Sequence, residues 1–138
     1  MTRPAVVFVH APDPLTRMGG GERYALAHAR AARRAGFDVH MFCVSDRTGV
    51  QEDEIGRVHR VWSPVRPFRN LMLAGHGPFL TRALRRFLRA RTGPHLLHGF
   101  GASTGSLLGV APGPGRPVAR VATVWDCLYE ESLAKYAG

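Results

Sequence analysis

Apolar and polar residues follow one another along the chain in blocks that predict alternating strands and helices. Ala5 to Val9 is a continuous apolar run, typical of a strand that is buried on both faces of a sheet. Glu22 to Ala35 has alanines on one helical face and arginines on another, which predicts an amphipathic helix that Gly36 ends. The other predicted elements are strands at 39–44, 57–62, 96–100 and 118–124, and helices at 78–91, 103–110 and 129–136.

This order predicts an α/β, Rossmann-like three-layer domain with a mostly parallel sheet and right-handed crossovers. In such sheets the ligand crevice lies beyond the carboxyl ends of the strands. The polar residues expected there are His10, Ser45, Asp46, His98 and Asp126.

The segment Gly19-Gly20-Gly21-Glu22, which opens the first predicted helix, is the strongest candidate for a binding site. Three glycines let a ligand approach the backbone closely, and the N–H groups and positive dipole end of the helix favour a phosphate or carboxylate. The alternative is a helix start in which the glycines only turn the chain and Glu22 offsets the dipole.

Other phosphate and nucleotide motifs fit poorly. No Gly-Lys-Ser/Thr follows the glycines, which excludes a Walker-type phosphate loop. The dinucleotide fingerprint requires glycines directly after the strand, whereas here Gly19 lies nine positions beyond His10.

Gly101-Ala102-Ser103-Thr104-Gly105 matches the pattern of a nucleophile elbow. A hydrolase of that type needs a histidine base after the serine, and the last histidine in this chain is His98. We therefore expect that Ser103 or Thr104 caps a helix and that the glycines permit close packing.

Metal binding is not expected. His95 and His98 are separated by an odd number of positions within a predicted strand, so their side chains should point to opposite faces. Cys43 and Cys127 lie in no metal-ligand spacing and are expected to be free thiols in a reducing, cytoplasmic setting.

The length of 138 residues suits one globular domain, and the formal charge of +9 should attract anionic ligands. The predicted helix at 78–91 has a broad apolar face opposite several arginines, which is typical of a helix that covers a sheet. The same pattern, with the basic segment 66–73, also allows peripheral contact with anionic lipid at the inner face of the membrane. No nucleic acid is expected as a partner, because the phenylalanines look like core residues.

Four segments in this order resemble the amino-terminal domain of family 4 glycosyltransferases, which have the two-domain GT-B architecture. The resemblance rests on Gly19-Gly20-Gly21-Glu22, on residues 34–39, on Pro94-His95-Leu96-Leu97-His98 and on residues 121–126. The first of these segments, which enters a helix, is the most specific part of the match, and the others are similar to the family's Gly-His-x-Val, its Pro-Asp-x-x-His and its Thr-x-His-Asp.

Three residues depart from the family pattern. Phe37 stands where the family prefers histidine, and His95 where it prefers aspartate, both at structural positions. Trp125 replaces a family histidine that commonly contacts the donor sugar, whereas the neighbouring Asp126 is retained.

The resemblance implies transfer of a sugar from a nucleotide-diphosphate donor to an unidentified acceptor, with retention of anomeric configuration and without a metal or other cofactor. It places Gly19, Gly20 and Gly21 at the donor phosphate or sugar, His98 and Asp126 at sugar or acceptor hydroxyls, and Asp126 as the catalytic candidate.

In this family most donor contacts come from a second, carboxyl-terminal domain, which is not found in these 138 residues. We therefore expect a fragment of a longer enzyme with little or no activity when isolated. The alternative is a basic, non-catalytic module that binds an anionic glycan, lipid or nucleic acid; a different Rossmann-like enzyme is a third interpretation.

Overall fold

The computed structural model describes residues 3–16, 19–64, 75–107, 109–110 and 117–123. Three sequence predictions lie outside these residues: the site residue Asp126 with its neighbours Trp125 and Cys127, the helix at 129–136, and the basic segment at 66–73. The described strands are β1 (Ala5–Val9), β2 (Asp38–Ser45), β3 (Gly49–Asp53), β4 (Gly56–Trp62), β5 (His95–Phe100) and β6 (Val118–Thr123). The helices are α1 (Gly20–Arg34), α3 (Gly77–Arg89) and the 3₁₀ helix η1 (Gly101–Leu107).

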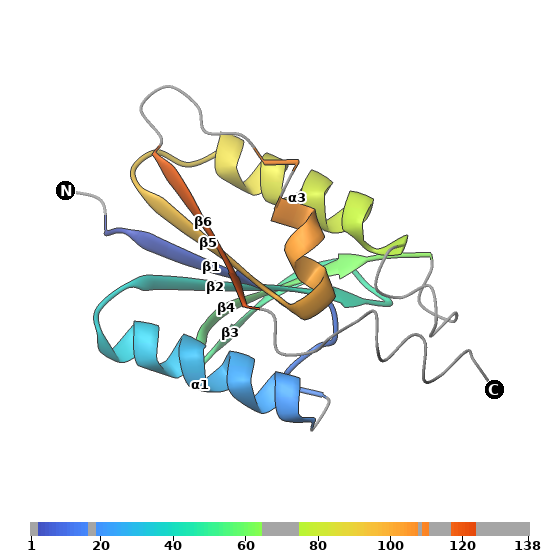
Figure 1. Cartoon of the computed structure of the whole chain (residues 1–138), viewed down its shortest axis with the longest axis horizontal. Coiled ribbons are helices and arrows are strands. Elements are labelled where there is room, and N and C mark those ends of the chain that lie inside the picture. Colours follow the sequence, from blue (N-terminus) through green and yellow to red (C-terminus); the bar gives the residue numbers. More distant parts are fainter. Residues whose placement is uncertain (1–2, 17–18, 65–74, 108, 111–116, 124–138) are drawn as a thin grey trace.

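The six strands form one sheet in the order β3-β4-β2-β1-β5-β6 (Figure 1). Strands β4, β2, β1, β5 and β6 are parallel, and only the edge strand β3 runs antiparallel. The chain places β2 and β4 on one side of β1 and later places β5 and β6 on its other side. The direction in which successive strands are added to the sheet therefore reverses between β1 and β5. This is the switch point at which open α/β sheets bind ligands. The predicted Rossmann-like fold with a mostly parallel sheet is confirmed.

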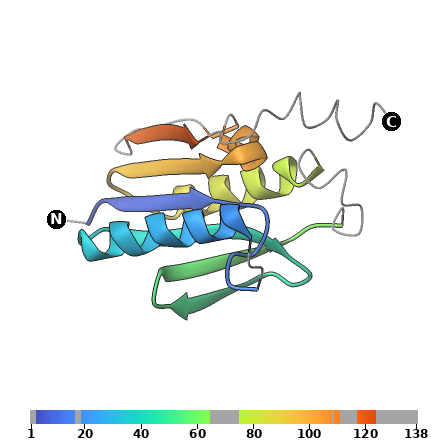
Figure 2. The same ribbon diagram turned by 60° about the horizontal axis from the view of Figure 1, so that its bottom comes forward.

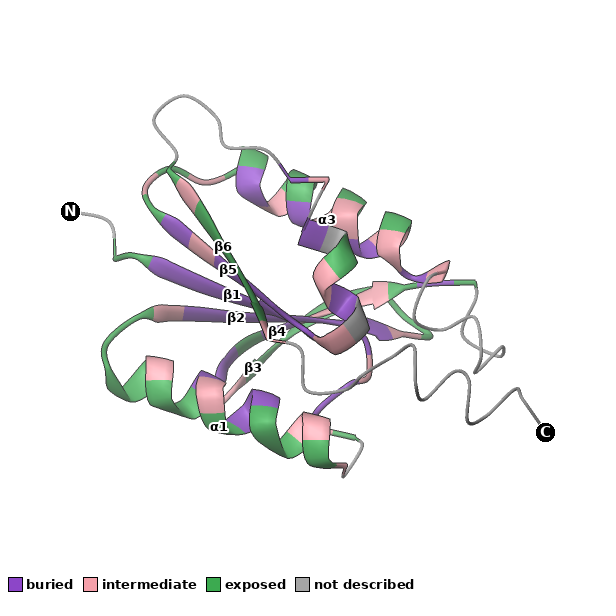
Figure 3. Cartoon of the chain, in the orientation of Figure 1, coloured by how far each residue is buried: buried purple, intermediate pink, exposed green. Residues whose placement is uncertain are grey.

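Helices α1 and α3 lie on opposite faces of the sheet, and the start of α1 lies at the end toward which β1 and β5 point (Figures 1 and 2). Each face has its own core because successive side chains of a strand point to opposite sides. The α1 side buries Val6, Phe8, Ala25, Leu26, Ala29, Met41 and Phe100, among others. The α3 side buries Val7, Val9, Phe42, Leu80, Leu84, Leu88 and Leu97, among others. Figure 3 shows the purple interior strands between helices that are green on their outer surfaces.

The end of α1 is a Schellman motif, as expected from Gly36. The N–H of Phe37 donates to the carbonyl of Ala32, and the N–H of Gly36 donates to that of Arg33. Gly36 has a φ of +91°, which glycine adopts without steric cost.

Several predicted boundaries differ from the structure. Helix α1 begins at Gly20, so two of the three glycines belong to its first turn. The strand β3 was missing from the prediction, and it pairs with β4 as a hairpin in place of a second helical crossover. The predicted helix at 103–110 is instead the 3₁₀ helix η1, which begins directly after β5.

The described residues contain no helix that is long and apolar enough to span a membrane. Cys43 is a free thiol in the core on the α1 side, as predicted, and burial together with Asp13 raises its pKa to about 12.

Candidate functional site

The loop that follows β1 is held against two neighbouring segments by hydrogen bonds of its backbone. The N–H of His10 donates to the carbonyl of Phe42, and the N–H of Val44 donates to the carbonyl of Ala11. The N–H of Ala11 donates in turn to the buried Ser103 Oγ at 2.8 Å. The chain therefore leaves β1 along a defined path toward the start of α1.

Asp13 anchors the next part of this loop. Its Oδ1 accepts a hydrogen bond from the N–H of Leu15, and its Oδ2 accepts one from Arg60 Nε at 2.8 Å. The side chains of both Asp13 and Arg60 are largely buried, which makes this charge-assisted contact stronger than an exposed ion pair. The pair ties the loop before the glycines to β4.

Gly19 is the N-cap of α1 and makes no side-chain capping hydrogen bond. The first N–H groups of a helix have no partner within the helix, and they carry the positive end of its dipole. Gly20 is exposed, and a Cβ atom placed on it would have no neighbour within 4 Å. The backbone at Gly20 is thus open to a ligand.

The side chain of Glu22, in the first turn of α1, lies against Gly19. A Cβ atom on Gly19 would collide with Glu22 Oε2. The second carboxylate oxygen, Oε1, lies 3.7 Å from His10 Nε2, and both side chains are at most 13% exposed. Burial lowers the pKa of His10, with Glu22 partly offsetting this effect, so His10 is neutral at pH 7. The protein's own carboxylate therefore occupies part of the positive end of α1.

Beneath α1, aromatic and imidazole rings form a continuous layer on the α1 side of β5. His98 stacks on Phe100 with ring centroids 4.4 Å apart, and His28 lies edge-on to His98 at 5.6 Å. Tyr24 in turn lies 4.2 Å from His28 and 5.8 Å from Phe100. Tyr24 and His28 were not among the predicted site residues, and their only signal in the sequence is a separation of four residues, which places both on one face of a helix.

His98 is 9% exposed, and its Nε2 lies 2.6 Å from Thr123 Oγ1 on the adjacent strand β6. Burial is the main cause that lowers the pKa of His98, and His28 adds to it. The ring is therefore a neutral imidazole whose contact with Thr123 sets its orientation.

The sequence-predicted residues share one face of the sheet. Gly19, Gly20 and Gly21 lie at the start of α1, and His98 contacts His28 in the third turn of the same helix. Tyr24 lies between these positions and contacts Phe100, which stacks on His98. The backbone N–H groups at the start of α1 therefore lie on the same side of the sheet as the ring layer, in which His98 contacts Thr123 Oγ1. Asp126 lies beyond the described residues, so its position relative to them remains a prediction.

Ser103 has a different structural role from the expected one. Its Oγ accepts the N–H of Ala11, 92 residues earlier, and does not cap a helix. Close packing occurs instead at Gly99, where a Cβ atom would lie 2.7 Å from the Cα of Thr104. His95 and His98 do point to opposite faces, as predicted, because His95 contacts Phe87 of α3 while His98 contacts His28 of α1.

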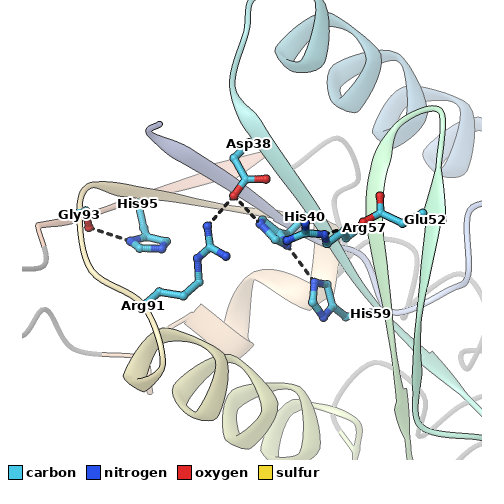
Figure 4. A network of polar contacts seen from close by, with 8 residues as sticks. All are labelled: Asp38, His40, Glu52, Arg57, His59, Arg91, Gly93 and His95. Carbon is cyan, nitrogen blue, oxygen red and sulfur yellow. Dashed lines mark hydrogen bonds and ion pairs between the residues drawn. The ribbon is translucent and has the colours of Figure 1, made fainter. Parts of the chain in front are cut away.

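A second polar cluster lies at the opposite end of the sheet, on its α3 face (Figure 4). Asp38 Oδ2 accepts hydrogen bonds from His40 Nε2 and Arg91, and His40 Nδ1 lies 2.9 Å from His59 Nε2. Since the carboxylate only accepts, His40 carries its proton on Nε2 and accepts from His59. An open hollow of about 480 Å³ lies beside this cluster.

Burial sets the protonation of these groups. Burial lowers the pKa of His40. Burial, with a further contribution from the nearby His40, lowers the pKa of His59 to about 4. Burial of Asp38 is outweighed by the hydrogen bonds from His40 and Arg91, so the pKa of Asp38 is lowered. This cluster lies at the amino ends of the strands and is separate from the candidate site. Across the described part of the chain, no three His, Cys, Asp or Glu residues are grouped to hold a metal.

Comparison with known proteins identifies one family. The model of the family described as Glycosyltransferase Family 4 matches residues 18–136, which is most of the chain and includes the glycines, His98 and Asp126. No curated protein and no solved structure gives a significant match.

Proposed function

The chain belongs to glycosyltransferase family 4 as an amino-terminal domain, and on this basis we propose that it contributes one wall of a site that transfers a sugar from a nucleotide-diphosphate donor. The main support is the open first turn of α1 at the switch point between β1 and β5. Anionic ligands bind at such helix starts, and ligands of parallel α/β sheets bind at such switch points.

In this proposal the backbone N–H groups of Gly20 and Gly21 donate to the donor diphosphate. As the bond between the anomeric carbon and the phosphate oxygen breaks, the diphosphate leaves with the electron pair and gains negative charge. Fixed N–H donors and the helix dipole stabilise that charge more in the transition state than in the ground state. The exposed position of Gly20, with no neighbour over it, leaves room for the phosphate.

His98 and Asp126 are proposed to contact sugar or acceptor hydroxyl groups, with Asp126 as the catalytic candidate. The neutral His98 is suited to hydrogen bonding because Thr123 and Phe100 hold its ring in place. We propose retention of anomeric configuration, no requirement for a metal or other cofactor, and an acceptor that is a small molecule, a glycan or a lipid-linked group.

Glu22 restricts the access of an anion to Gly19 in the free protein, because the Glu22 carboxylate lies over Gly19. An anion that uses the N–H of Gly19 would have to displace that carboxylate. We therefore propose that the diphosphate first engages Gly20 and Gly21, and that the chain by itself has little or no transferase activity without a second, donor-binding domain.

The test is a titration of the ¹⁵N-labelled chain with uridine diphosphate and guanosine diphosphate, followed by NMR. The amide signals of Gly19, Gly20 and Gly21 should shift more than those of other glycines. A Gly20→Leu variant should lose this response, because the new side chain covers the open N–H groups.

The matched control is Gly77→Leu. Gly77 is likewise the first residue of a helix, and a Cβ atom on it would also have no neighbour within 4 Å. This variant should keep the diphosphate response. Equal responses from the Gly20→Leu variant and the unmodified chain would refute the proposed phosphate site.

A further inference from the structure

The charges of this chain are distributed unevenly along its sequence. Between Ile55 and Trp125 there is no aspartate or glutamate, although arginine recurs throughout this segment. The segment contains β4, α3, β5, η1 and β6, and α3 covers the sheet face opposite α1. The arginines of this segment are therefore not offset by acidic side chains of the same segment.

Helix α3 carries the densest part of this charge. Arg82, Arg85, Arg86 and Arg89 are all exposed and follow the spacing that places residues on one helical face. The opposite face of the helix is buried through Leu80, Leu84 and Leu88. The arginines therefore belong to the outer surface of α3, which faces away from the sheet (Figure 3).

These arginines are not neutralised by the part of the protein that the structure describes. Arg85 donates to the carbonyl of Gly109, whereas no described carboxylate pairs with Arg82, Arg86 or Arg89. Like charges three and four residues apart on a helix repel one another and destabilise it. A surface of negative charge would relieve this repulsion.

An exposed aromatic side chain lies at the amino end of the same helix. Trp62, at the end of β4, is 50% exposed, and its ring lies 6.2 Å from that of Phe79 in the first turn of α3. Arg82 follows Phe79 by three residues and lies on the same side of the helix. Tryptophan beside arginine is typical of protein surfaces that rest at the boundary between lipid headgroups and acyl chains.

We propose that the outer face of α3, formed by Arg82, Arg86 and Arg89, docks together with the neighbouring Trp62 of β4 on a bilayer that contains anionic phospholipid. The arginines bind the phosphate headgroups, and Trp62 enters the interfacial region. The buried leucines of α3 remain in the core, so the contact is peripheral and needs no unfolding of the helix. Nucleic acid is disfavoured because Phe87, which lies among the arginines of α3 in the sequence, packs against His40, Phe42 and His59 and offers no stacking surface.

The experiment is co-sedimentation of the chain with vesicles of phosphatidylcholine, with or without phosphatidylglycerol, at low and high salt. We expect salt-sensitive binding to the anionic vesicles only. The variant Arg82→Gln/Arg86→Gln/Arg89→Gln should bind roughly a hundredfold more weakly, since each arginine near an anionic bilayer contributes about a fivefold factor. Glutamine favours helix, so this variant should remain folded by circular dichroism.

The matched control removes three exposed arginines from α1, on the opposite face, as Arg23→Gln/Arg33→Gln/Arg34→Gln. It should retain vesicle binding within about threefold, because the attraction of an arginine to an anionic bilayer falls off within a Debye length of the surface. Equal losses in the two variants would show that only net charge matters, and this would overturn the proposal, as would failure of the unmodified chain to bind anionic vesicles.

A fluorescence measurement separates lipid from other polyanions. In a Trp125→Phe background Trp62 is the single tryptophan, and its emission should shift to the blue on anionic vesicles. Duplex RNA and polyphosphate should leave the emission unchanged. Tighter binding to RNA than to vesicles, or an unshifted Trp62 on vesicles that sediment the protein, would refute the docking geometry. None of these measurements requires nucleotide sugar, so their outcome is independent of the proposed transferase site.

Discussion

The carboxylate of Glu22 lies over the Cα of Gly19, so that any side chain at position 19 would collide with it. Glu22 is the third residue of α1, the position from which a glutamate can turn back toward the N-cap. The positive end of α1 is consequently shared between an internal carboxylate beside His10 and an open surface at Gly20.

Glu22→Gln should therefore strengthen binding of inorganic pyrophosphate to the chain. Removal of one negative charge next to the bound anion is expected to lower the Kd about fivefold at low salt, and less at high salt. NMR titration measures the change. Glu54→Gln is the control, because Glu54 is exposed and pairs with Arg30 away from the glycines. Weaker binding by Glu22→Gln would instead mean that Glu22 holds the glycines in their binding geometry.

Ser103→Ala should destabilise the domain without altering pyrophosphate binding. The substitution removes the acceptor of the buried Ala11 N–H, which costs about 1–3 kcal/mol of unfolding free energy. Urea denaturation measures this loss, and Ser45→Ala, at a serine that bonds its exposed neighbour Asp46, should change stability much less. If the unmodified chain hydrolysed a model ester and Ser103→Ala did not, the serine would be a nucleophile after all.

The unfolding free energy should fall as the pH is lowered from about 6.5 to about 4. The pKa of His59 is lowered to about 4 in the folded protein, so the unfolded chain binds more protons in this window and acid favours unfolding. His59 accounts for up to about 3 kcal/mol, and the lowered pKa values of His10, His40, His76 and His98 act in the same direction.

Urea denaturation at several pH values measures this slope. His59→Gln keeps an N–H donor for His40 but does not titrate, so its stability should depend less steeply on pH. Ser45→Ala changes no histidine and no partner of His40 or His59, so it should keep the slope of the unmodified chain. A slope that is identical in all three proteins would contradict the assignment to His59.

Two glycines with positive φ should respond differently to alanine. Gly56 has a φ of +123°, and a Cβ atom there would collide with the backbone carbonyl of Val39. Gly36 has a φ of +91° and open space around it. Gly36→Ala should cost about 1–2 kcal/mol from backbone strain alone, whereas Gly56→Ala should cost more than about 3 kcal/mol or prevent folding. Thermal denaturation of both variants provides the comparison, and similar melting temperatures would be inconsistent with the collision at Gly56.

Elements with a clear apolar pattern were predicted well, and those without one were not. The run from Ala5 to Val9 became the central strand, and the alanine face of α1 is buried. Strand β3 was missed because it is an exposed edge strand; Val50, its one large apolar residue, is 63% exposed. Strand β3 is held by backbone pairing with β4, and such pairing requires no regular alternation of apolar and polar residues in the sequence.

The candidate site was likewise predicted only in part from the sequence. The glycines were found because they share a short segment with the helix start, and His98 was found through its place near a strand end. The ring layer of Tyr24, His28 and Phe100 was not found, since it joins a helix to a strand more than 70 residues away. The contact of His98 with Thr123 likewise depends on the register of β5 and β6.

Local sequence alone determined the Rossmann-like fold, the glycine-rich helix start, the free thiol of Cys43 and the basic character of α3, because each depends on residues that are close in the chain. The tertiary structure decided which side chains share the carboxyl end of the sheet, that Glu22 covers Gly19, and that Ser103 is an acceptor for Ala11. Those contacts depend on how distant segments pack together, and sequence spacing carries no direct information about that packing.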